Sequence, residues 1–324
     1  MPLSMENTDN TLSIKGYHIV RVHPQRMTDM QDLYMAVYGK SLAADYYAHK
    51  YNTEYTGIRD IGFIAYKDAE AAAYYGVIPC YLRYQGKVIL AAQSADTMTH
   101  PKHQQKGLFT LLANLTYNLC QLEGIKLLFG FPNQRSLPGF VQKLGWHIAG
   151  YMECFDISVN TLPLEKMANK FGFSKNLYYC YGNSILKKRL LSNRGITNDD
   201  AHEADLSVER NTDYLQYKRY HDTRTMEING MQIWFKIQDG LIIGDIKGQA
   251  FQLPDTLKAL KKMAFQLGLN HIRWQTTPQT SLYTALQAHY PSFPTFPIIL
   301  KAIDLNDQMD WGNIVFTYAD IDIF

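Results

Sequence analysis

The sequence predicts a mixed α/β fold in two lobes, the second smaller than the first, and three observations lead to this prediction. Runs of alternating apolar residues, typical of strands, are interspersed with amphipathic runs, typical of helices, along most of the chain. A polar and acidic stretch at 193–206 has the composition of a linker. The length of 324 residues suffices for two domains or for one large one.

The pattern of apolar residues in the first half of the chain predicts ten elements in order. These are a strand, two helices, three antiparallel strands, and then a helix, a strand, a helix and a strand. Alternating apolar positions indicate the strands, and apolar residues three and four apart indicate the helices. Gln85 and Gly86 suit a hairpin turn, and Gly124 suits the position after a helix end. The elements are expected at 17–22, 29–38, 43–51, 61–66, 72–84, 88–99, 108–122, 126–131, 133–146 and 147–157.

The second half predicts a mixed helical stretch at 162–192 and then a smaller lobe. In that lobe the order hairpin, helix, strand, helix, strand repeats the second half of the first lobe, although an unrelated α+β domain explains the pattern equally well. Its elements are expected at 231–237, 241–246, 255–267, 271–275, 281–289, 297–303 and 315–318. The predicted domains are 1–160, a helical connector and linker at 161–206, and 207–324.

Composition limits the classes of function. The apolar fraction of 46% and the charged fraction of 19% are those of a soluble globular protein. A net charge of +2 favours neither nucleic acid nor an anionic membrane as a partner. The polar start of the sequence lacks a signal core, and no apolar run approaches the roughly 20 residues of a membrane span, so a cytoplasmic protein is expected. Cys80, Cys120, Cys154 and Cys180 show no CxxC spacing and are expected as buried thiols.

The stretch HPKHQQKGLFTLL, residues 100–112, lies between a predicted strand and a predicted helix. The first N–H groups of a helix have no partner within it, and the helix dipole places partial positive charge there, so such a turn can bind phosphate. Gly107 lets an anion approach the main chain, and Lys106 adds a cation. An ordinary polar turn is the alternative interpretation.

This stretch resembles motif A of the GNAT superfamily of N-acetyltransferases, in which a Gln/Arg-x-x-Gly-x-Gly/Ala turn holds the pyrophosphate of acetyl-CoA. Gln104, Gly107 and Phe109 occupy the signature positions, and the element order of the first half is that of the GNAT fold. Phe109 departs from the usual Gly/Ala, which is tolerable if its ring points into the core. The resemblance implies acetyl-CoA as co-substrate, no metal, and a binding turn made of Gln104, Gln105, Lys106, Gly107, Leu108, Phe109 and Thr110.

The resemblance also assigns the rest of the donor site. It implies that the strand before the turn offers backbone N–H groups to the pantetheine arm and the thioester, and by position these belong to Thr97, Met98 and Thr99. Asn133 and Ser136 hold the positions that meet the CoA arm in the family. A helix cap or turn is the alternative role of Asn133. The second lobe lacks a comparable phosphate turn.

The implied activity is transfer of an acetyl group to a primary amine by direct attack in a ternary complex, because the sequence shows no nucleophile motif. An amine with a pKa of roughly 10 needs a base. Asp96 is the first candidate and His100 the second, although Asp96 serves equally well as a structural carboxylate. The family's tyrosine acid is replaced by Phe140 and Val141, and Tyr151 is a possible substitute.

The acceptor is expected to be an amino sugar, a peptide or an antibiotic-like amine, in a cleft lined partly by tyrosines among Tyr46, Tyr47, Tyr51 and Tyr55. Core packing is the alternative role of these rings. Two other functions remain open: a non-catalytic CoA-binding protein, and a transferase that uses another acyl or aminoacyl donor. A donor carried by tRNA would require a basic groove, which the near-neutral charge disfavours. An oligomer is not excluded.

Overall fold

The computed structural model describes residues 12–170, 174–193, 195–197, 204–305 and 311–324. The chain forms two compact units, which are described separately. Unit 1 contains Met1–Leu82, Lys87–Ala149 and Ile298–Asp310, and unit 2 contains Arg83–Gly86, Gly150–Pro297 and Trp311–Phe324. In the described part of the chain, no helix has the length and apolar character that a membrane span requires.

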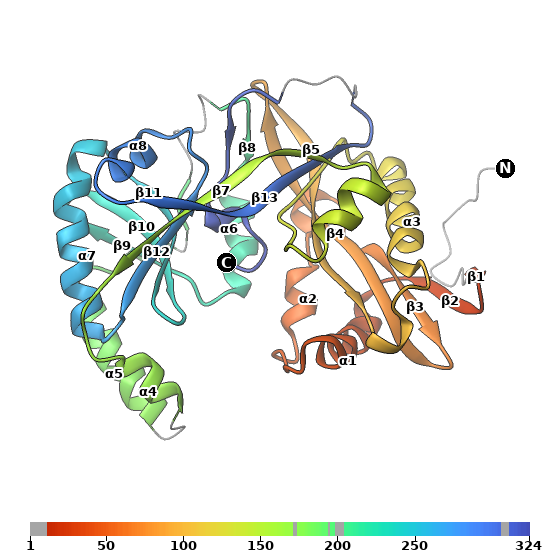
Figure 1. Ribbon diagram of the computed structural model, residues 1–324, viewed down its shortest axis with the longest axis horizontal. Helices are drawn as coiled ribbons and strands as arrows, with labels where there is room; N and C mark the ends of the chain where they lie inside the picture. Colours follow the sequence, from red (N-terminus) through yellow and green to blue (C-terminus); the bar gives the residue numbers. More distant parts are fainter. Residues whose placement is uncertain (1–11, 171–173, 194, 198–203, 306–310) are drawn as a thin grey trace. The chain divides into compact units, whose positions relative to one another are not determined.

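Unit 1 is built on a mixed sheet with helices packed against it (Figure 1). Its strands run antiparallel except for β5 and β6, which are parallel and joined by α3. The strand order is β1 (Leu12–Ile14), β2 (Tyr17–Arg21), β3 (Ile61–Lys67), β4 (Glu70–Tyr84), β5 (Lys87–Thr99), β6 (Leu127–Gly130) and the end of β13 (Ser292–Ala302). The helices are α1 (Met27–Tyr38), α2 (Tyr46–Lys50) and α3 (Leu108–Leu122).

Helix α3 holds the binding turn in place because one of its faces is fully buried. Leu108, Leu112 and Ala113 pack with Phe63 and Ala65 of β3 in the apolar core of unit 1. Burial of a leucine side chain contributes about 1.5–3 kcal/mol, so this face fixes the helix firmly on the sheet. The helix begins at Leu108 and ends at Leu122, as the spacing of its apolar residues predicts.

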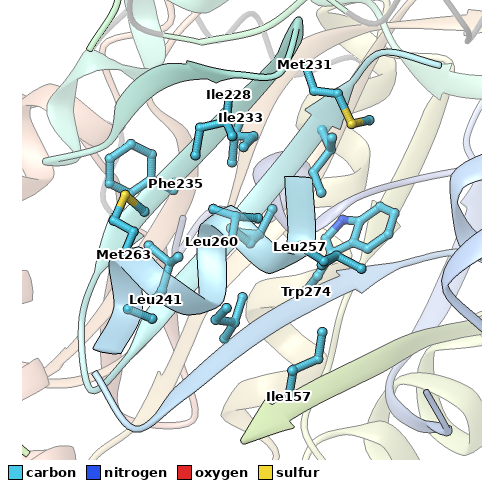
Figure 2. Close-up of a cluster of buried hydrophobic side chains, with 14 of the residues drawn as sticks. Ile157, Ile228, Met231, Ile233, Phe235, Leu241, Leu257, Leu260, Met263 and Trp274 are labelled. Carbon is cyan, nitrogen blue, oxygen red and sulfur yellow. The ribbon is translucent and has the colours of Figure 1, made fainter. Parts of the chain in front are cut away.

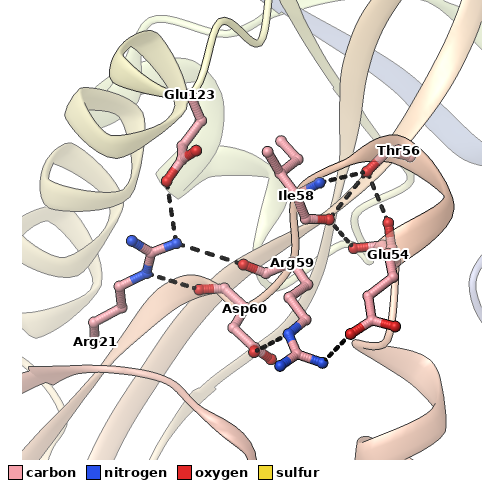
Figure 3. A network of polar contacts seen from close by, with 8 residues as sticks. Arg21, Glu54, Thr56, Ile58, Arg59, Asp60 and Glu123 are labelled. Atoms are coloured by element: carbon pink, nitrogen blue, oxygen red, sulfur yellow. Dashed lines mark hydrogen bonds and ion pairs between the residues drawn. The ribbon is translucent and has the colours of Figure 1, made fainter. Parts of the chain in front are cut away.

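The far end of α3 is tied to the sheet by a polar network (Figure 3). Arg21 of β2 donates from Nη2 to Oε1 of Glu123, which follows the helix, at 3.2 Å. The same guanidinium donates from Nε to the carbonyl oxygen of Asp60 at 3.2 Å, just before β3 begins. Nε of Arg59 lies 3.4 Å from Oδ2 of Asp60. The network therefore joins β2, β3 and α3 at the end opposite the binding turn.

In unit 2 the strands also run in a mixed arrangement, with one long helix on their face. The strand order is β7 (His147–Ser158), β12 (His271–Thr276), β11 (Leu241–Lys247), β10 (Met231–Ile237) and β9 (Arg224–Ile228). Helix α7 (Leu253–Leu267) buries Leu257, Leu260 and Met263 against Ile233, Phe235 and other apolar side chains of the sheet (Figure 2). The other elements are α4 (Leu164–Lys170), α5 (Ser174–Leu186), β8 (Leu206–Val208), α6 (Thr212–Tyr217), α8 (Ser281–Gln287) and β14 (Ile314–Val315).

The two units share a central motif. In unit 1, β5 pairs in parallel with β6 only over Ala91–Gln93, and α3 connects the two strands. In unit 2, β11 pairs in parallel with β12 only over Leu241–Ile243, and α7 connects them. Each parallel pair is preceded by an antiparallel neighbour, β4 in unit 1 and β10 in unit 2. A GNAT-like second lobe, which the sequence predicts, has this arrangement.

The strand that follows each parallel pair in the sequence joins the parallel pair of the other unit. β7 follows β6 along the chain and β13 follows β12. The residues of β7 from Glu153 to Ser158 pair antiparallel with β12 in unit 2, and the residues of β13 from Ile299 to Ala302 pair antiparallel with β6 in unit 1. The units therefore divide the chain differently from the predicted ranges 1–160, 161–206 and 207–324. Hydrophobic periodicity identifies a strand but carries no information about the sheet that it joins.

Some local expectations also differ. The strand expected at 72–84 begins two residues earlier, at Glu70, and the helix expected at 43–51 covers only Tyr46–Lys50. The strand expected at 315–318 is reduced to Ile314–Val315, followed by a 3-10 turn at Tyr318–Asp320. Cys180 is exposed, whereas the other three cysteines are buried as predicted. Of the predicted linker, residues 194 and 198–203 lie outside the described part of the chain.

Lys236 of β10 predicts a pH dependence of stability. Burial lowers the pKa of its ammonium from 10.5 to about 8, although Nζ donates to the carbonyl oxygen of Ile323 at 2.6 Å. Between these two values the unfolded chain binds more protons than the folded chain, so this residue makes stability rise with pH. The free energy of unfolding, measured with urea from pH 8 to pH 10, should rise in the wild type relative to Lys236→Met. Parallel curves would contradict the assignment.

Candidate functional site

The predicted phosphate turn connects β5 to α3, and its conformation leaves the first backbone N–H groups of the helix accessible. A 3-10 turn at Pro101–His103 follows β5, and the chain then passes through Gln105 at φ 61° and Gly107 at φ 78°. Both values lie in the left-handed region, which favours glycine at the second position. Gly107 is the N-cap of α3 and has no side chain to occupy the first N–H groups of the helix.

The N–H groups at the start of the helix have no acceptor among the described residues. None of these residues accepts a hydrogen bond from the backbone N–H of Gly107, Leu108, Phe109 or Thr110. The side chains from Gln104 to Gly107 are exposed, so the groups are accessible to solvent. A run of free donors at the positive end of a 15-residue helix is a site for a phosphate or a diphosphate.

Lys15, which the sequence analysis did not identify, places a cation beside the turn. Nζ of Lys15, in the turn between β1 and β2, lies 3.6 Å from the position that a Cβ atom on Gly107 would take. Lys106 is exposed on the turn itself. Nδ1 of His103 lies 3.0 Å from the hydroxyl of Tyr17, which ties the turn to β2. No sequence signal identifies Lys15, because the pairing of β1 with β2 alone brings it here.

Phe109, the departure from the family pattern, does not obstruct the turn. Its ring lies 5.9 Å from the ring of Tyr75 and 5.3 Å from that of Phe140, both buried. A Cβ atom on Gly139 would approach Cε1 of Phe109 to 2.9 Å, so the ring fills the space above this glycine. The ring points into the core, as the sequence analysis requires, and leaves the backbone N–H of Phe109 free.

The strand that precedes the turn separates from its parallel neighbour. The register of β5 with β6 ends at Gln93, so in the described structure the residues of β5 beyond it have no partner in β6. The predicted thioester donors Thr97, Met98 and Thr99 belong to this part of β5. Asp96 has φ 49°, in the left-handed region that few residues other than glycine adopt.

A buried chain of polar groups holds β5 and α3 together. Oγ of Ser94 donates to the hydroxyl of Tyr75 at 3.2 Å, and that hydroxyl lies 3.0 Å from the hydroxyl of Tyr117 in α3. Nε1 of Trp146 donates to Tyr117 at 2.8 Å. Burial raises the pKa of both tyrosines, so the hydroxyls stay protonated. The network fixes the angle at which strand and helix diverge, and nothing in the sequence identifies it.

Asn133 performs the turn role that the sequence left open. Its Oδ1 accepts from the N–H groups of Arg135 at 2.9 Å and Ser136 at 3.0 Å, and the hydroxyl of Ser136 also turns towards it at 3.3 Å. The side-chain nitrogen of Asn133 has no acceptor among the described residues. Asn133 and Ser136 are thus brought together, and the amide nitrogen remains available to a ligand.

Asp96, the first candidate base, forms an ion pair. Its Oδ2 lies 2.7 Å from Nζ of Lys50, whose side chain is fully buried, and accepts from the hydroxyl of Tyr51 at 2.9 Å. Burial raises the pKa of Tyr51 well above its ordinary value, so this hydroxyl acts as a donor. A buried ammonium needs a counter-charge, and Asp96 supplies it. The side chain of Asp96 is 14% exposed, so one part of it reaches solvent.

His100, the second candidate, is engaged on both ring nitrogens. Its Nδ1 accepts from the N–H of Lys102 at 3.2 Å, which caps the 3-10 turn. Its Nε2 lies 3.4 Å from Oε1 of Glu70. These contacts give His100 a structural role in shaping the turn.

The remaining candidate residues belong to the other unit or to the apolar core. Tyr151 is an exposed residue of β7 and belongs to unit 2, whereas the binding turn belongs to unit 1. Phe140 is buried in the core of unit 1. Among the predicted cleft tyrosines, Tyr47 and Tyr51 are buried, and the hydroxyl of Tyr47 donates to Sδ of Met98 at 3.9 Å. Core packing is therefore the role of these two rings.

Among its described residues, unit 2 shows no equivalent of the turn. At the start of the helical segment that leads into α7, Gln249 and Gln252 form a capping box, in which the N–H of Gln249 donates to Oε1 of Gln252 at 2.9 Å. The cap occupies donors that a ligand would need. Within the described residues, no group of three or more His, Cys, Asp or Glu side chains could hold a metal ion.

Comparison with known proteins finds one family over part of the chain. The profile of the acetyltransferase (GNAT) domain matches residues 18–149, which include β3–β6, α3 and the turn that precedes α3. This region of the chain is therefore similar to a GNAT domain. No curated protein sequence matches the chain.

Solved structures match most of the chain in fold. A probable N-acyltransferase from Enterococcus faecalis has 12% identity and a TM-score of 0.58, over 89% of this chain and 73% of that one. A GCN5-related N-acetyltransferase from Anabaena variabilis has 12% identity and a TM-score of 0.57, with the same coverage. A GCN5-related N-acetyltransferase from Kribbella flavida has 9% identity and a TM-score of 0.55, over 89% of this chain and 72% of that one.

Proposed function

We propose that this protein transfers an acetyl group from acetyl-CoA to a primary amine by direct attack in a ternary complex. The observation that carries the proposal is the row of unpaired backbone N–H groups from Gly107 to Thr110, at the start of a helix within the region that matches the GNAT domain. Lys15 and Lys106 supply positive charge at the same place. This donor set suits the diphosphate of CoA, because anions bind helix N-termini through such groups.

The binding position of the rest of the donor molecule is inferred from the separation of β5 from β6. The backbone of Thr97, Met98 and Thr99 would receive the pantetheine arm, and their N–H groups would stabilise the oxyanion that forms at the thioester carbonyl. The amine nitrogen bonds to the carbonyl carbon, the bond from carbon to sulfur breaks, and the CoA thiolate leaves. A thiolate with a pKa near that of cysteine, roughly 8.5, leaves without an obligatory acid, so the replacement of the family tyrosine by Phe140 is tolerable.

Turnover separates this function from its alternatives. The purified chain is incubated with acetyl-CoA and a panel of amino sugars, peptides and antibiotic-like amines, and the released thiol is measured. In parallel, calorimetry measures the binding of acetyl-CoA. Binding with turnover supports the proposal. Binding without turnover of any acceptor favours a non-catalytic CoA-binding protein, and binding of neither acetyl-CoA nor CoA would remove the proposed function.

The role of Asp96 is tested by replacement with asparagine. If Asp96 accepts the proton of the amine, Asp96→Asn should lower kcat by roughly 100-fold or more and leave the Kd of acetyl-CoA unchanged. The same change leaves Lys50 buried without its counter-charge, so we expect the free energy of unfolding to fall by about 3–5 kcal/mol. Steady-state kinetics and urea unfolding measure the two effects separately.

The double variant Lys50→Met, Asp96→Asn serves as the matched control. It removes both charges, and Tyr51 can still donate to the new amide oxygen, so stability should return towards that of the wild type. A stable double variant with low kcat would identify Asp96 as the base. If both kcat and stability recover in the double variant, Asp96 has a structural role and is not the base.

A further inference from the structure

A cavity of unit 2 is lined by none of the residues of the proposed acyl-transfer site. It has a volume of about 180 Å³ and is enclosed by α5 and by the strands β9 and β10. Its walls include Tyr179, Asn183 and Leu186 of α5, Arg224 of β9, and Phe235 and Ile237 of β10. All of these residues belong to unit 2, and the sequence analysis assigned none of them a function.

Arg224 supplies the polar wall of this cavity. Its Nη1 donates to Oδ1 of Asn183 at 2.6 Å, and its Nε lies 3.9 Å from Oδ1 of Asp222, beyond hydrogen-bond distance. The guanidinium carbon lies 5.3 Å from the centre of the Tyr179 ring. A guanidinium has five N–H donors, so several of those on Arg224 have no acceptor among the described residues. Its side chain is 22% exposed and therefore open to a ligand.

The neighbouring acidic groups leave room for an anion. The carboxylate of Glu165 accepts from the N–H groups of Asp239 at 2.8 Å and Gly240 at 2.9 Å, so both of its oxygens are occupied. The side chain of Asp222 is 86% exposed and is screened by water. Lys175 and Lys236 add two further cations to the lining. Three cations therefore face two carboxylates around the cavity, and a negatively charged group beside Arg224 would meet net positive charge.

The opposite wall is apolar. Phe235 and Leu186 are buried in the core cluster of unit 2 and present hydrocarbon surface to the cavity, and Ile237 packs against the same cluster. An apolar cavity of about 150 Å³ can hold a benzene ring, so the volume here suits one ring with a small substituent. Apolar walls with a few convergent polar groups are the usual composition of small-molecule sites.

We propose that this cavity binds a small aromatic carboxylate, with the carboxylate on the guanidinium of Arg224 and the ring against Phe235 and Leu186. The planar fork of arginine matches a carboxylate with two parallel hydrogen bonds. An inorganic anion would leave the apolar wall unused, and a neutral aromatic compound would leave the free donors of Arg224 unpaired. The proposal does not depend on acetyl-CoA chemistry, since its residues lie in unit 2 and outside the region 18–149 that matches the GNAT domain.

Benzoate, benzyl alcohol and inorganic phosphate are the probes, titrated into the full chain and followed by amide chemical shifts. We expect benzoate to bind at least about tenfold more tightly than either of the other two, because only benzoate uses both walls. Equal binding of benzyl alcohol, or tighter binding of phosphate, would overturn the proposal. Absence of saturable benzoate binding would overturn it as well.

Two variants localise the binding. Arg224→Gln should weaken benzoate binding by at least about tenfold, whereas Arg219→Gln, at an exposed arginine in the same unit, should leave it unchanged. Tyr179→Ala removes a 56% exposed ring that stacks on Arg224, so it tests the site without disturbing the core, and it should also weaken binding. Affinity that is unchanged in both Arg224→Gln and Tyr179→Ala would refute this location.

Discussion

Replacement of Gly107 with aspartate is expected to weaken the binding of acetyl-CoA by at least about 100-fold, which is the largest effect on ligand binding that the structure predicts. Gly107 has φ 78°, so a Cβ atom there strains the turn and stands where the ligand approaches. The new carboxylate also places negative charge beside free N–H donors that would otherwise meet a diphosphate. Calorimetric titration with acetyl-CoA measures the loss.

Gly124→Asp is the control for backbone strain. Gly124 has φ 79° and, like Gly107, is a glycine in the left-handed region at one end of α3, but nothing lies within 4 Å of its potential Cβ atom. This variant should lose stability to a similar degree while its Kd for acetyl-CoA remains that of the wild type. Unchanged affinity in Gly107→Asp would show that the turn does not hold the diphosphate.

Arg210→Met is expected to lower the free energy of unfolding by about 3–5 kcal/mol, which is as large as the loss expected of Asp96→Asn. The side chain of Arg210 is fully buried in unit 2 and donates to both oxygens of Asp320, each at 2.8 Å, and to the hydroxyl of Thr317 at 2.7 Å. It also pairs with Asp245. Burial raises the pKa of Asp245 against the opposing effect of Arg210, so loss of the guanidinium leaves two carboxylates in a medium that disfavours their charge.

Urea unfolding of Arg210→Met and of the exposed Arg219→Met provides the comparison. The exposed variant should stay within about 0.5 kcal/mol of the wild type, as surface substitutions usually do. A second comparison adds Asp245→Asn and Asp320→Asn to Arg210→Met, which removes the unpaired charges and should recover part of the loss. A loss below about 1 kcal/mol in Arg210→Met would mean that the buried ion network contributes little.

The part of the site that depends on local chain geometry could be predicted from the sequence. The helix 108–122 follows from its apolar spacing, and a glycine before it marks the N-cap, so the turn and its free N–H groups were placed correctly. The inward direction of Phe109 was a condition of the prediction and is met by its contacts with Tyr75 and Phe140. Local signals are sufficient here because a helix start is defined within a few residues of chain.

Contacts between distant segments could not be predicted. Asp96 was singled out as a carboxylate in a strand, but its partner Lys50 comes from α2, and no sequence pattern couples the two. Lys15 reaches the turn from the hairpin of β1 and β2, and β1 itself was not predicted because it covers only Leu12–Ile14. The sheet to which a strand belongs depends on tertiary packing, which outweighs local propensity.

The exchange of β7 and β13 has a consequence for biosynthesis. β6 ends at Gly130, but its antiparallel neighbour, Ile299–Ala302, is translated about 170 residues later. During that interval a nascent polypeptide on the ribosome presents one unsatisfied edge of β6, and such edges are prone to aberrant association. For the same reason, proteolytic or recombinant fragments that stop near residue 149 would lack the outermost strand of unit 1.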